Sequence, residues 1–450
     1  MKKIHFIGIG GISMSGIAQI MKSRGYQVSG SDRSETDMTR RLEASGIAVS
    51  IGQRAENITP DMDTIVYTAA VHEDNPELIA ARASGARVIE RAVMLGELLD
   101  EFAVPVGVAG THGKTSTSSM LAYIYMAADL DPSVAIGGVL QNLGANYRVG
   151  RGDHMLIEAC EYCDSFLHFH TKYNIITNIE AEHLDYFKDL ADIQDSFHEY
   201  VAGMREGGTL ITAADCAPLF KDLPVQVLSV SLDDPADITA ENIVHHDNAL
   251  GSSFEMIYKG ENLGRLDIYV PGRHLIFDAL CAAAAAIAEG ISFDAVRQGL
   301  ANYKSTQKRF EYKGDYKGAK VVDDYAHHPS EIKATMLAAR EVLHNELYVV
   351  FQPHTFSRTI AFFDDFVSTL SMADHLLLAD IYSAREEDTG EVSSKKLADA
   401  IAKNGIDVHY FPTFDEIEKF LEKNISTNDL LITMGAGNAV DIANHLLSKK

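Results

Sequence analysis

The chain has 450 residues, of which 46% are hydrophobic and 23% are charged, a composition typical of a globular protein with several domains. Its formal net charge of −25 argues against nucleic acid and an anionic membrane surface as partners. No apolar run is long enough to span a membrane, and the glycines that begin at Gly8 interrupt any signal-peptide core. Four cysteines are too scattered for a disulfide framework. We therefore expect a cytoplasmic protein.

The first hundred residues alternate between strand-like and helix-like patterns. The predicted elements are strands at residues 4–8, 27–32 and 64–69 and helices at 13–22 and 91–102. Such alternation is typical of a parallel sheet with crossover helices. A new strand at 104–110 then leads into a second glycine-containing loop, so we place the first domain boundary near residue 100.

The rest of the chain continues in the same α/β pattern. Its predicted elements are strands at 175–178, 320–323, 346–351, 375–380 and 430–434 and an alanine-rich helix at 279–288. A polar stretch at 304–307 is typical of a linker. We therefore predict an α/β protein with three domains, at residues 1–100, 101–304 and 305–450.

The sequence GTHGKT, which starts at Gly110, lies between a predicted strand and a helix that begins near Thr115. Glycines allow backbone N–H groups to converge on phosphate oxygens, and the helix N-terminus adds the positive end of its dipole. Lys114 would reach the outer phosphates, and the Thr115 hydroxyl would bind Mg²⁺. The eight-residue P-loop pattern is incomplete, because Val108 stands at its first glycine. A chance glycine turn before a helix is the alternative.

An earlier glycine loop comes close to the dinucleotide-binding fingerprint. Gly8, Gly10 and Ser13 are followed by Asp32 at the end of the next predicted strand. By itself this pattern indicates an NAD-dependent oxidoreductase, although Ser13 replaces the third glycine. A UDP-sugar presents the same pyrophosphate to such a loop. The second phosphate loop favours the UDP-sugar, because a simple dehydrogenase has no use for it.

Five motifs, in this order along the chain, together resemble the Mur ligases. They are GIGGISMSG from Gly8, GTHGKTS from Gly110, DDYAHHP from Asp323, FQPHTFSR from Phe351 and DIYSARE from Asp380. The resemblance implies a Rossmann-like UDP-binding domain, a central P-loop-type ATPase domain and a C-terminal Rossmann-like domain. Within the family, the motifs are most similar to the branch that joins L-alanine to UDP-N-acetylmuramate.

The activity implied by the resemblance is an ATP-dependent ligation in the synthesis of peptidoglycan precursors. L-Alanine would be joined to the lactyl carboxylate of UDP-N-acetylmuramate through an acyl phosphate, which gives ADP and phosphate. ATP and Mg²⁺ are the implied cofactors, and a monomer or a homodimer is expected. A murein-peptide recycling ligase of the same family remains an alternative, as does a degenerate homologue that binds a nucleotide-sugar without ligating it.

The same resemblance assigns residues to three ligands. Expected at the UDP-sugar are Gly8, Gly10, Gly11, Ser13, Met14, Ser15 and Asp32. Expected at ATP are Gly110, Thr111, His112, Gly113, Lys114, Thr115, Ser116, Arg309 and Asp324. Expected at the amino acid are Tyr325, His327, His354 and Arg358, of which the last two would bind the carboxylate. For His328, Arg385 and Glu386, a purely structural role stays open.

Metal and catalytic roles follow from the same resemblance. Thr115, Glu158 and His183 are the implied metal ligands, and Lys114, Glu158, His183 and Arg309 the catalytic residues. Arg309 would neutralise charge on the transferred phosphoryl group. Glu161 stays open between a functional and a structural role. His198 stands where many members carry a carbamoylated lysine, so we expect no such modification.

The chain departs from the family pattern in the sequence GRHLIFDAL. Leu275 and Asp278 stand where the family usually has two asparagines at the adenine. An asparagine amide can donate to adenine N7 and accept from N6. A leucine can do neither, and an ionised aspartate can only accept. We therefore predict weaker ATP binding than is usual for the family, or tolerance of other purine nucleotides.

Replacing Asp278 by asparagine should tighten ATP binding. One lost two-point match costs roughly 1–3 kcal/mol of discrimination, so we expect a clear fall in the KM for ATP in Asp278→Asn. The measurement is KM for ATP and for GTP in both proteins. Tight ATP binding and rejection of GTP by the native protein, unchanged by the substitution, would mean that other residues recognise the base.

Overall fold

The computed structural model describes residues 2–68, 70–140, 143–183, 186–246, 250–305, 308–384, 386–388 and 390–449. The chain forms two compact units. The first comprises Met1–Glu241, Glu255–Leu266 and Phe277–Tyr303, and the second Asn242–Phe254, Asp267–Ile276 and Lys304–Lys450. Among the described residues, no helix is both long and apolar enough to cross a membrane.

A parallel sheet near the start of the chain confirms the pattern predicted there. Its five described strands have the order β3-β2-β1-β4-β5, and all their pairings are parallel. The strands are β1 Lys3–Ile7, β2 Gln27–Asp32, β3 Ala48–Ile51, β4 Thr64–Tyr67 and β5 Arg87–Glu90. The strand predicted at 64–69 thus ends at Tyr67, and Ala69 lies outside the described residues.

Helices cover both faces of this sheet. They are α1 Ile12–Ser23, α2 Asp37–Ala44, α3 Pro76–Ala83 and α4 Arg91–Asp100. Phe6 and Val66 face a core shared with α1 and α4, whereas Ile7 and Ile65 pack with Leu78 of α3. Successive residues of one strand are therefore buried on opposite faces, as expected for a parallel sheet between helices.

A second sheet contains ten described strands and carries the loop that begins at Gly110. Its order is β15-β14-β13-β12-β11-β10-β6-β9-β7-β8. The strands are β6 Val104–Ala109, β7 Ser133–Leu140, β8 Ala145–Arg148, β9 His154–Glu158, β10 Tyr173–Ile176, β11 Thr209–Ala213, β12 Gln226–Val230, β13 Ile238–His245, β14 Ser252–Tyr258 and β15 Glu261–Ile268. β6 lies parallel between β10 and β9, so the carboxyl ends of all three strands meet at one edge.

The helices that accompany this sheet are α5 Lys114–Ala127, α6 Leu190–Ala202, α7 Arg273–Ala288 and α8 Phe293–Asn302. The alanine-rich helix predicted at 279–288 is part of α7, which begins six residues earlier, at Arg273. Its alanines at 279 and 282–286 are fully buried, because small side chains allow close packing. Helix α5 lies against α8.

The second unit contains the third predicted α/β domain. Its six described strands have the order β16-β17-β21-β18-β19-β20, and only β16 is antiparallel to its neighbour. The strands are β16 Glu311–Tyr316, β17 Ala319–Asp324, β18 Leu347–Phe351, β19 His375–Leu378, β20 Asp407–Tyr410 and β21 Leu430–Met434. Thr306 and Gln307 of the predicted linker lie outside the described residues.

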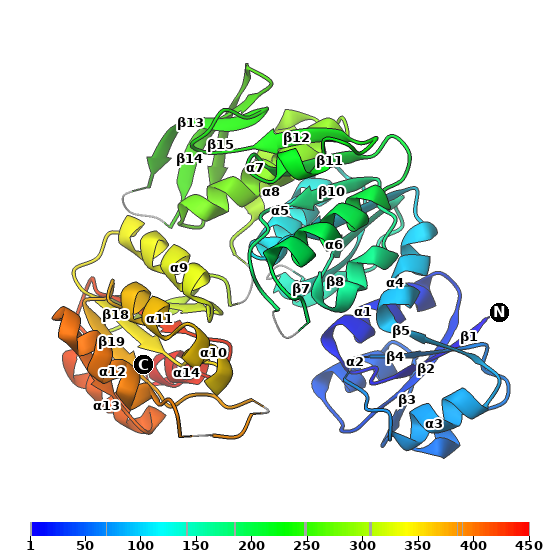
Figure 1. Ribbon diagram of the computed structural model, residues 1–450, viewed down its shortest axis with the longest axis horizontal. Coiled ribbons are helices and arrows are strands. Elements are labelled where there is room, and N and C mark those ends of the chain that lie inside the picture. The colour runs from blue at the N-terminus through cyan, green and yellow to red at the C-terminus, as the bar shows by residue number, and fades with distance from the viewer. Residues whose placement is uncertain are drawn as a thin grey trace. The chain divides into compact units, whose positions relative to one another are not determined.

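Helices again cover both faces of this sheet (Figure 1). They are α9 Pro329–Glu341, α10 Phe356–Ala361, α11 Phe363–Leu370, α12 Ser394–Ile401, α13 Phe414–Asn424 and α14 Val440–Ser448. Short 3₁₀ helices complete the chain: η1 Ala55–Asn57, η2 Tyr162–His168, η3 Ala217–Phe220 and η4 Ala402–Asn404. Ile432 faces α9, α11 and α12, whereas Leu431 faces α13 and α14. The three sheets give the chain the α/β class that the sequence predicts.

Truncation of Phe166 should destabilise the first unit. This side chain is fully buried in η2, stacked on Tyr200 with ring centroids 4.4 Å apart and edge-on to Phe197 at 5.1 Å. Phe166→Ala leaves a cavity, so we expect a loss of about 3–5 kcal/mol in the free energy of unfolding, measured by urea titration. Tyr162→Ala, at a residue that is 38% exposed, is the control and should cost about 1 kcal/mol or less.

Candidate active site

The loop between β6 and α5 has a backbone that favours glycine at two positions. Gly110 has a φ of 128°, and Gly113, the N-cap of α5, has a φ of 81°. A Cβ atom at Gly110 would lie 2.2 Å from Thr177 Oγ1, so a side chain there would collide with the chain after β10. The first turn of α5 follows this loop with N–H groups that are suited to an anion.

Polar groups that follow β10 hold this loop in place. His112 N donates to Asn178 Oδ1 at 2.8 Å, and Asn178 Nδ2 donates to His112 O at 3.1 Å. Thr111 N donates to Asn178 O at 3.2 Å. The strand predicted at 175–178 is therefore wrong at its end, because β10 stops at Ile176 and Asn178 serves the loop instead of the sheet.

Lys114, the first residue of α5, directs its ammonium back onto the loop. Nζ donates to Gly110 O at 2.5 Å, to Thr111 O at 3.1 Å and to Glu161 Oε2 at 3.1 Å. Burial opposes the charged form, but nearby carboxylates, Glu161 above all, raise the pKa of Lys114 beyond its ordinary value. Lys114 is therefore a permanent cation beside the loop.

Thr115 contacts Glu158, the last residue of β9. Its Oγ1 donates to Glu158 Oε2 at 2.9 Å, and Gly137 N donates to the same oxygen at 2.7 Å. Glu158 reaches this position because β9 lies beside β6, with Glu158 opposite Val108. Ser116, the next residue of α5, is buried.

His183 lies with a different pair of carboxylates. Ligand atoms of Glu161, Glu182 and His183 all lie within 4.8 Å of one another, the only such group found among the described residues. Two carboxylates and an imidazole fit a divalent cation that prefers oxygen. Glu158 thus contacts Thr115, whereas His183 contacts Glu161 at 4.0 Å.

The two departures from the family pattern lie in α7. Leu275 and Asp278 are both buried. A Cβ atom at Gly113 would lie 2.6 Å from Asp278 Oδ1, so this carboxylate borders the glycine loop itself.

The first glycine loop is held by Asp32. Asp32 Oδ2 accepts from Gly10 N at 2.9 Å, and Gly11 is the N-cap of α1. Ser13 Oγ accepts from Arg91 Nη1 at 2.9 Å, which places a cation beside the loop. Met14 and Ser15 lie in the interior. Of the residues expected at the UDP-sugar, these two can therefore offer a ligand only their backbone.

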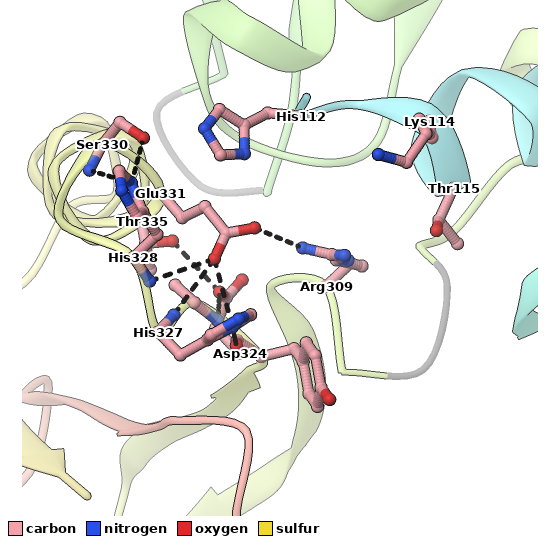
Figure 2. Close-up of polar contacts among 12 residues, drawn as sticks. His112, Lys114, Thr115, Arg309, Asp324, His327, His328, Ser330, Glu331 and Thr335 are labelled. Atoms are coloured by element: carbon pink, nitrogen blue, oxygen red, sulfur yellow. Dashed lines mark hydrogen bonds and ion pairs between the residues drawn. The ribbon is translucent and has the colours of Figure 1, made fainter. Parts of the chain in front are cut away.

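In the second unit, Arg309 faces a carboxylate. Arg309 Nη1 lies 3.6 Å from Glu331 Oε1 (Figure 2). Glu331 Oε2 also accepts from His327 N at 3.1 Å and from His328 N at 3.2 Å. His328 caps α9 together with Glu331, which gives His328 a structural role. Glu331 was not singled out from the sequence.

Asp324, at the end of β17, ties together the segments around it. Oδ2 accepts from Phe310 N at 2.7 Å, and Oδ1 accepts from Ala326 N at 2.8 Å and Thr335 Oγ1 at 3.1 Å (Figure 2). Burial raises the pKa of Asp324 above its ordinary value. Both oxygens thus serve protein partners and position the chain that follows Arg309.

The four residues expected at the amino acid form one chain of contacts. The rings of Tyr325 and His327 are 5.1 Å apart, and those of His327 and His354 are 5.9 Å apart. Arg358 Nη1 donates to His354 Nδ1 at 3.1 Å. Burial, then the charges of His327 and Arg358, lower the pKa of His354 to about 4. His354 is therefore neutral near pH 7 and leaves the charge on Arg358.

Two further residues of the last motifs were left open by the sequence. Glu386 Oε2 accepts from Ser357 N at 2.9 Å, beside the start of α10, which indicates a structural role. Arg385 lies outside the described residues.

Comparison with known proteins matches three family models to the chain in order. "Mur ligase family, catalytic domain" matches residues 3–103, "Mur ligase middle domain" residues 108–286, and "Mur ligase, glutamate ligase domain" residues 308–437. The UDP-N-acetylmuramate–L-alanine ligase of Agathobacter rectalis is 47% identical over 99% of this chain and 98% of its own length. That of Clostridium novyi is 44% identical over 100% and 98%.

The chain belongs to the Mur ligase family. Among solved structures, the UDP-N-acetylmuramate–alanine ligase of Thermotoga maritima matches this Mur ligase with a TM-score of 0.83 and 27% identity, over 100% of this chain and 99% of that one. A murein peptide ligase of Psychrobacter arcticus matches with a TM-score of 0.67 and 25% identity, over 100% and 98%. The predicted family and its α/β fold of three domains are confirmed.

Sequence reasoning missed four polar residues at the sites of this Mur ligase. They are Arg91, which contacts Ser13, Glu182 in the cluster with His183, Glu331 beside Arg309, and Asn178 at the loop. Glu182 adjoins His183 in the sequence, which was the available signal. Arg91 and Glu331 carry no such signal, because only the fold brings them to their partners.

The carboxyl of Asp323 should make the stability of this Mur ligase depend on pH. Burial, and then the charges of Asp324 and Glu311, raise the pKa of Asp323 from 3.8 to about 6. The folded protein thus holds this proton more tightly than the unfolded chain. The resulting stabilisation is complete below about pH 4 and is lost as the pH rises through about 6.

Asp323→Asn should remove this contribution. Between pH 4.5 and pH 7.5 the native protein should lose about 2 kcal/mol of its free energy of unfolding relative to the variant. Urea titration at both pH values measures the change. Asp399→Asn, at an exposed position of α12, is the control and should follow the native protein. Equal pH dependence of Asp323→Asn and the native protein would contradict the assignment.

Proposed function

We propose that the chain catalyses the ATP-dependent ligation of L-alanine to the lactyl carboxylate of UDP-N-acetylmuramate, a step of peptidoglycan precursor synthesis. The observation that carries this proposal is similarity over the whole length. The curated L-alanine ligases are 42–47% identical to the chain over at least 99% of it. We therefore assign UDP-N-acetylmuramate and L-alanine, which the names of those proteins give, to this chain as its substrates.

The chemistry begins with a carboxylate, which is a poor electrophile near pH 7. Transfer of the γ-phosphoryl group of ATP to it gives an acyl phosphate. The amine of L-alanine then attacks, the tetrahedral intermediate collapses, and phosphate leaves. The protein mainly positions these groups and neutralises charge, as in other phosphoryl transfers.

We assign the ATP phosphates to the loop from Gly110 to Ser116, with Lys114 and Arg309 as the cations. The fixed loop backbone supports this assignment, because it presents N–H groups at a helix N-terminus. Mg²⁺, when bound, would neutralise phosphate charge. Thr115, Glu158 and His183 are its proposed ligands, and Glu161 and Glu182 join them on the geometry of their cluster. Asp324 would act by positioning the segment of Arg309.

The amino acid is assigned to the second unit. Arg358 would bind its carboxylate, because neutral His354 accepts from the guanidinium without competing for the anion. Tyr325 and His327 would form the rest of the pocket. The UDP-sugar is assigned to the first glycine loop, where Arg91 adds a cation for the pyrophosphate.

The domain limits 1–100, 101–304 and 305–450, the cytoplasmic location and a monomeric or dimeric state stay predictions. Among the alternatives, a murein-peptide recycling ligase is disfavoured by the comparisons. The Psychrobacter arcticus murein peptide ligase matches with 25% identity and a TM-score of 0.67, against 0.83 for the alanine ligase of Thermotoga maritima. An oxidoreductase is disfavoured by the second phosphate loop. The remaining alternative, a degenerate homologue that does not ligate, is tested by the assay below.

A phosphate-release assay tests the proposed function. The purified protein is mixed with UDP-N-acetylmuramate, ATP and Mg²⁺, and each of a panel of amino acids is added in turn. We expect release of phosphate with L-alanine, and formation of the ligated product by mass spectrometry. Release that requires a peptide in place of L-alanine would establish the recycling activity instead. No release with any acceptor would establish the degenerate homologue.

Arg358→Lys tests the amino-acid pocket. A lysine keeps the charge but loses the planar fork that binds a carboxylate at two points. We expect the KM for L-alanine to rise about tenfold or more, which is the loss of one charge-assisted hydrogen bond, while the KM for ATP changes little. Steady-state kinetics with each substrate varied in turn measure both. A rise in the KM for ATP alone would move the amino-acid pocket elsewhere.

A further inference from the structure

Lys114 has no hydrogen-bond donor left for a phosphate. An ammonium group has three donors, and those of Lys114 contact Gly110 O, Thr111 O and the carboxylate of Glu161. Two of these acceptors belong to the loop, whose backbone is held by Asn178. Of these three acceptors, only the carboxylate of Glu161 belongs to a side chain, so it alone can move away from Lys114 while the loop keeps its backbone conformation.

Glu161 is buried, with 3% of its surface exposed. Its Oε1 and Oε2 lie 3.2 and 3.1 Å from Lys114 Nζ. Removing the cation from such a carboxylate leaves a buried charge uncompensated, which is strongly unfavourable. Other acidic groups, Glu158 and Glu182, also act on Lys114 and would repel a released Glu161. The carboxylate therefore needs a second cation before Lys114 can turn to a phosphate.

The cluster with His183 supplies a place for that second cation. Glu161 Oε1 lies 4.0 Å from His183 Nε2, and Glu182 brings another carboxylate within 4.8 Å. The carboxylate oxygens and the imidazole nitrogen of this cluster are suitable ligands for a hard divalent cation. The carboxylate of Glu161 thus lies between Lys114 on one side and His183 and Glu182 on the other.

We propose that Glu161 is a positioning residue that occupies Lys114 while the phosphate loop is empty and is transferred to a divalent cation when nucleotide binds. Without the cation, ATP must compete with Glu161 for Lys114. With it, Glu161 is neutralised from the other side and Lys114 is released to the phosphates. Nucleotide affinity is thereby made dependent on the metal. This inference rests on the proposed function, since it takes ATP as the ligand of the loop.

The test is nucleotide binding with and without metal in Glu161→Gln. Glutamine has nearly the same shape as glutamate but no charge, so it cannot hold Lys114 as an ion pair. Isothermal titration calorimetry with ADP, once in EDTA and once in Mg²⁺, gives four dissociation constants for the native protein and the variant. In EDTA we expect the variant to bind ADP about tenfold more tightly, because like charges brought together at a binding site cost several kcal/mol. The gain in affinity on adding Mg²⁺ should shrink correspondingly.

Glu182→Gln is the matched control. It removes the same charge from the same cluster, but among the described residues Lys114 donates to Glu161 and not to Glu182. We expect weaker binding of Mg²⁺ and less than about a threefold change in ADP binding in EDTA, since it removes only a more distant charge. Glu161→Asp keeps the charge and should keep the weak binding in EDTA.

Two results would overturn the inference. One is ADP binding in EDTA that is unchanged or weaker in a folded Glu161→Gln, with folding checked by thermal unfolding. If that variant does not fold, Glu161→Asp decides instead, because equally tight binding with and without Mg²⁺ in that variant would show that the carboxylate does not compete. Absence of nucleotide binding by the native protein in Mg²⁺ would overturn the proposed function as well. If the native protein ligates L-alanine, the proposed function stands, and either of the two results above overturns only the role of Glu161.

Discussion

Neutralisation of charge is the constraint on which the rest of this structure depends. A site for ATP must hold cations close together, and the chain has a net charge of −25. Lys114 is paired with Glu161, and Arg309 with Glu331. Each cation is thus compensated by a carboxylate. In the function proposed above, each of these pairs is rearranged when phosphate binds, because the carboxylate and the phosphate compete for the same cation.

The order of the strands brings the charges of the first unit together. β10, β6 and β9 are parallel neighbours, and the residues that follow them are Asn178, Gly110 and Glu161. Because parallel strands end at the same edge, segments far apart in the sequence meet there. Ligand sites in α/β folds form at this edge for the same reason. The loop from Gly110 is therefore held by hydrogen bonds to Asn178 on one side, and its Lys114 is paired with Glu161 on the other.

The acidic character of the site extends to α7. Asp278 borders Gly113, so the glycine loop has a carboxylate on the α7 side as well as Glu161 at Lys114. In the function proposed above, both carboxylates oppose phosphate binding in the absence of a cation. The proposed dependence of nucleotide binding on metal therefore rests on residues around the loop.

The sequence by itself determined the α/β class, the family and the positions of both glycine loops. These follow from local patterns: alternating elements, glycines at turns, and five motifs in a characteristic order. It also identified Thr115, His183, Arg309 and Arg358 as candidates, through the same motifs. Their roles stay predictions, but the structure places each of them at the polar contacts described above.

Only the tertiary structure decided which charges meet. Glu161 is 47 residues from Lys114 in the sequence, and Arg91 is 78 residues from Ser13. No local pattern encodes such pairs, because they depend on strand order and on how helices pack on the sheets. The strand end at Ile176 was misjudged for the same reason. Thr177 and Asn178 suit a strand by their neighbours, and Thr177 N still donates to Ala109 O of β6. Asn178 O, however, accepts from Thr111 N of the loop, a contact that exists only once the fold has formed.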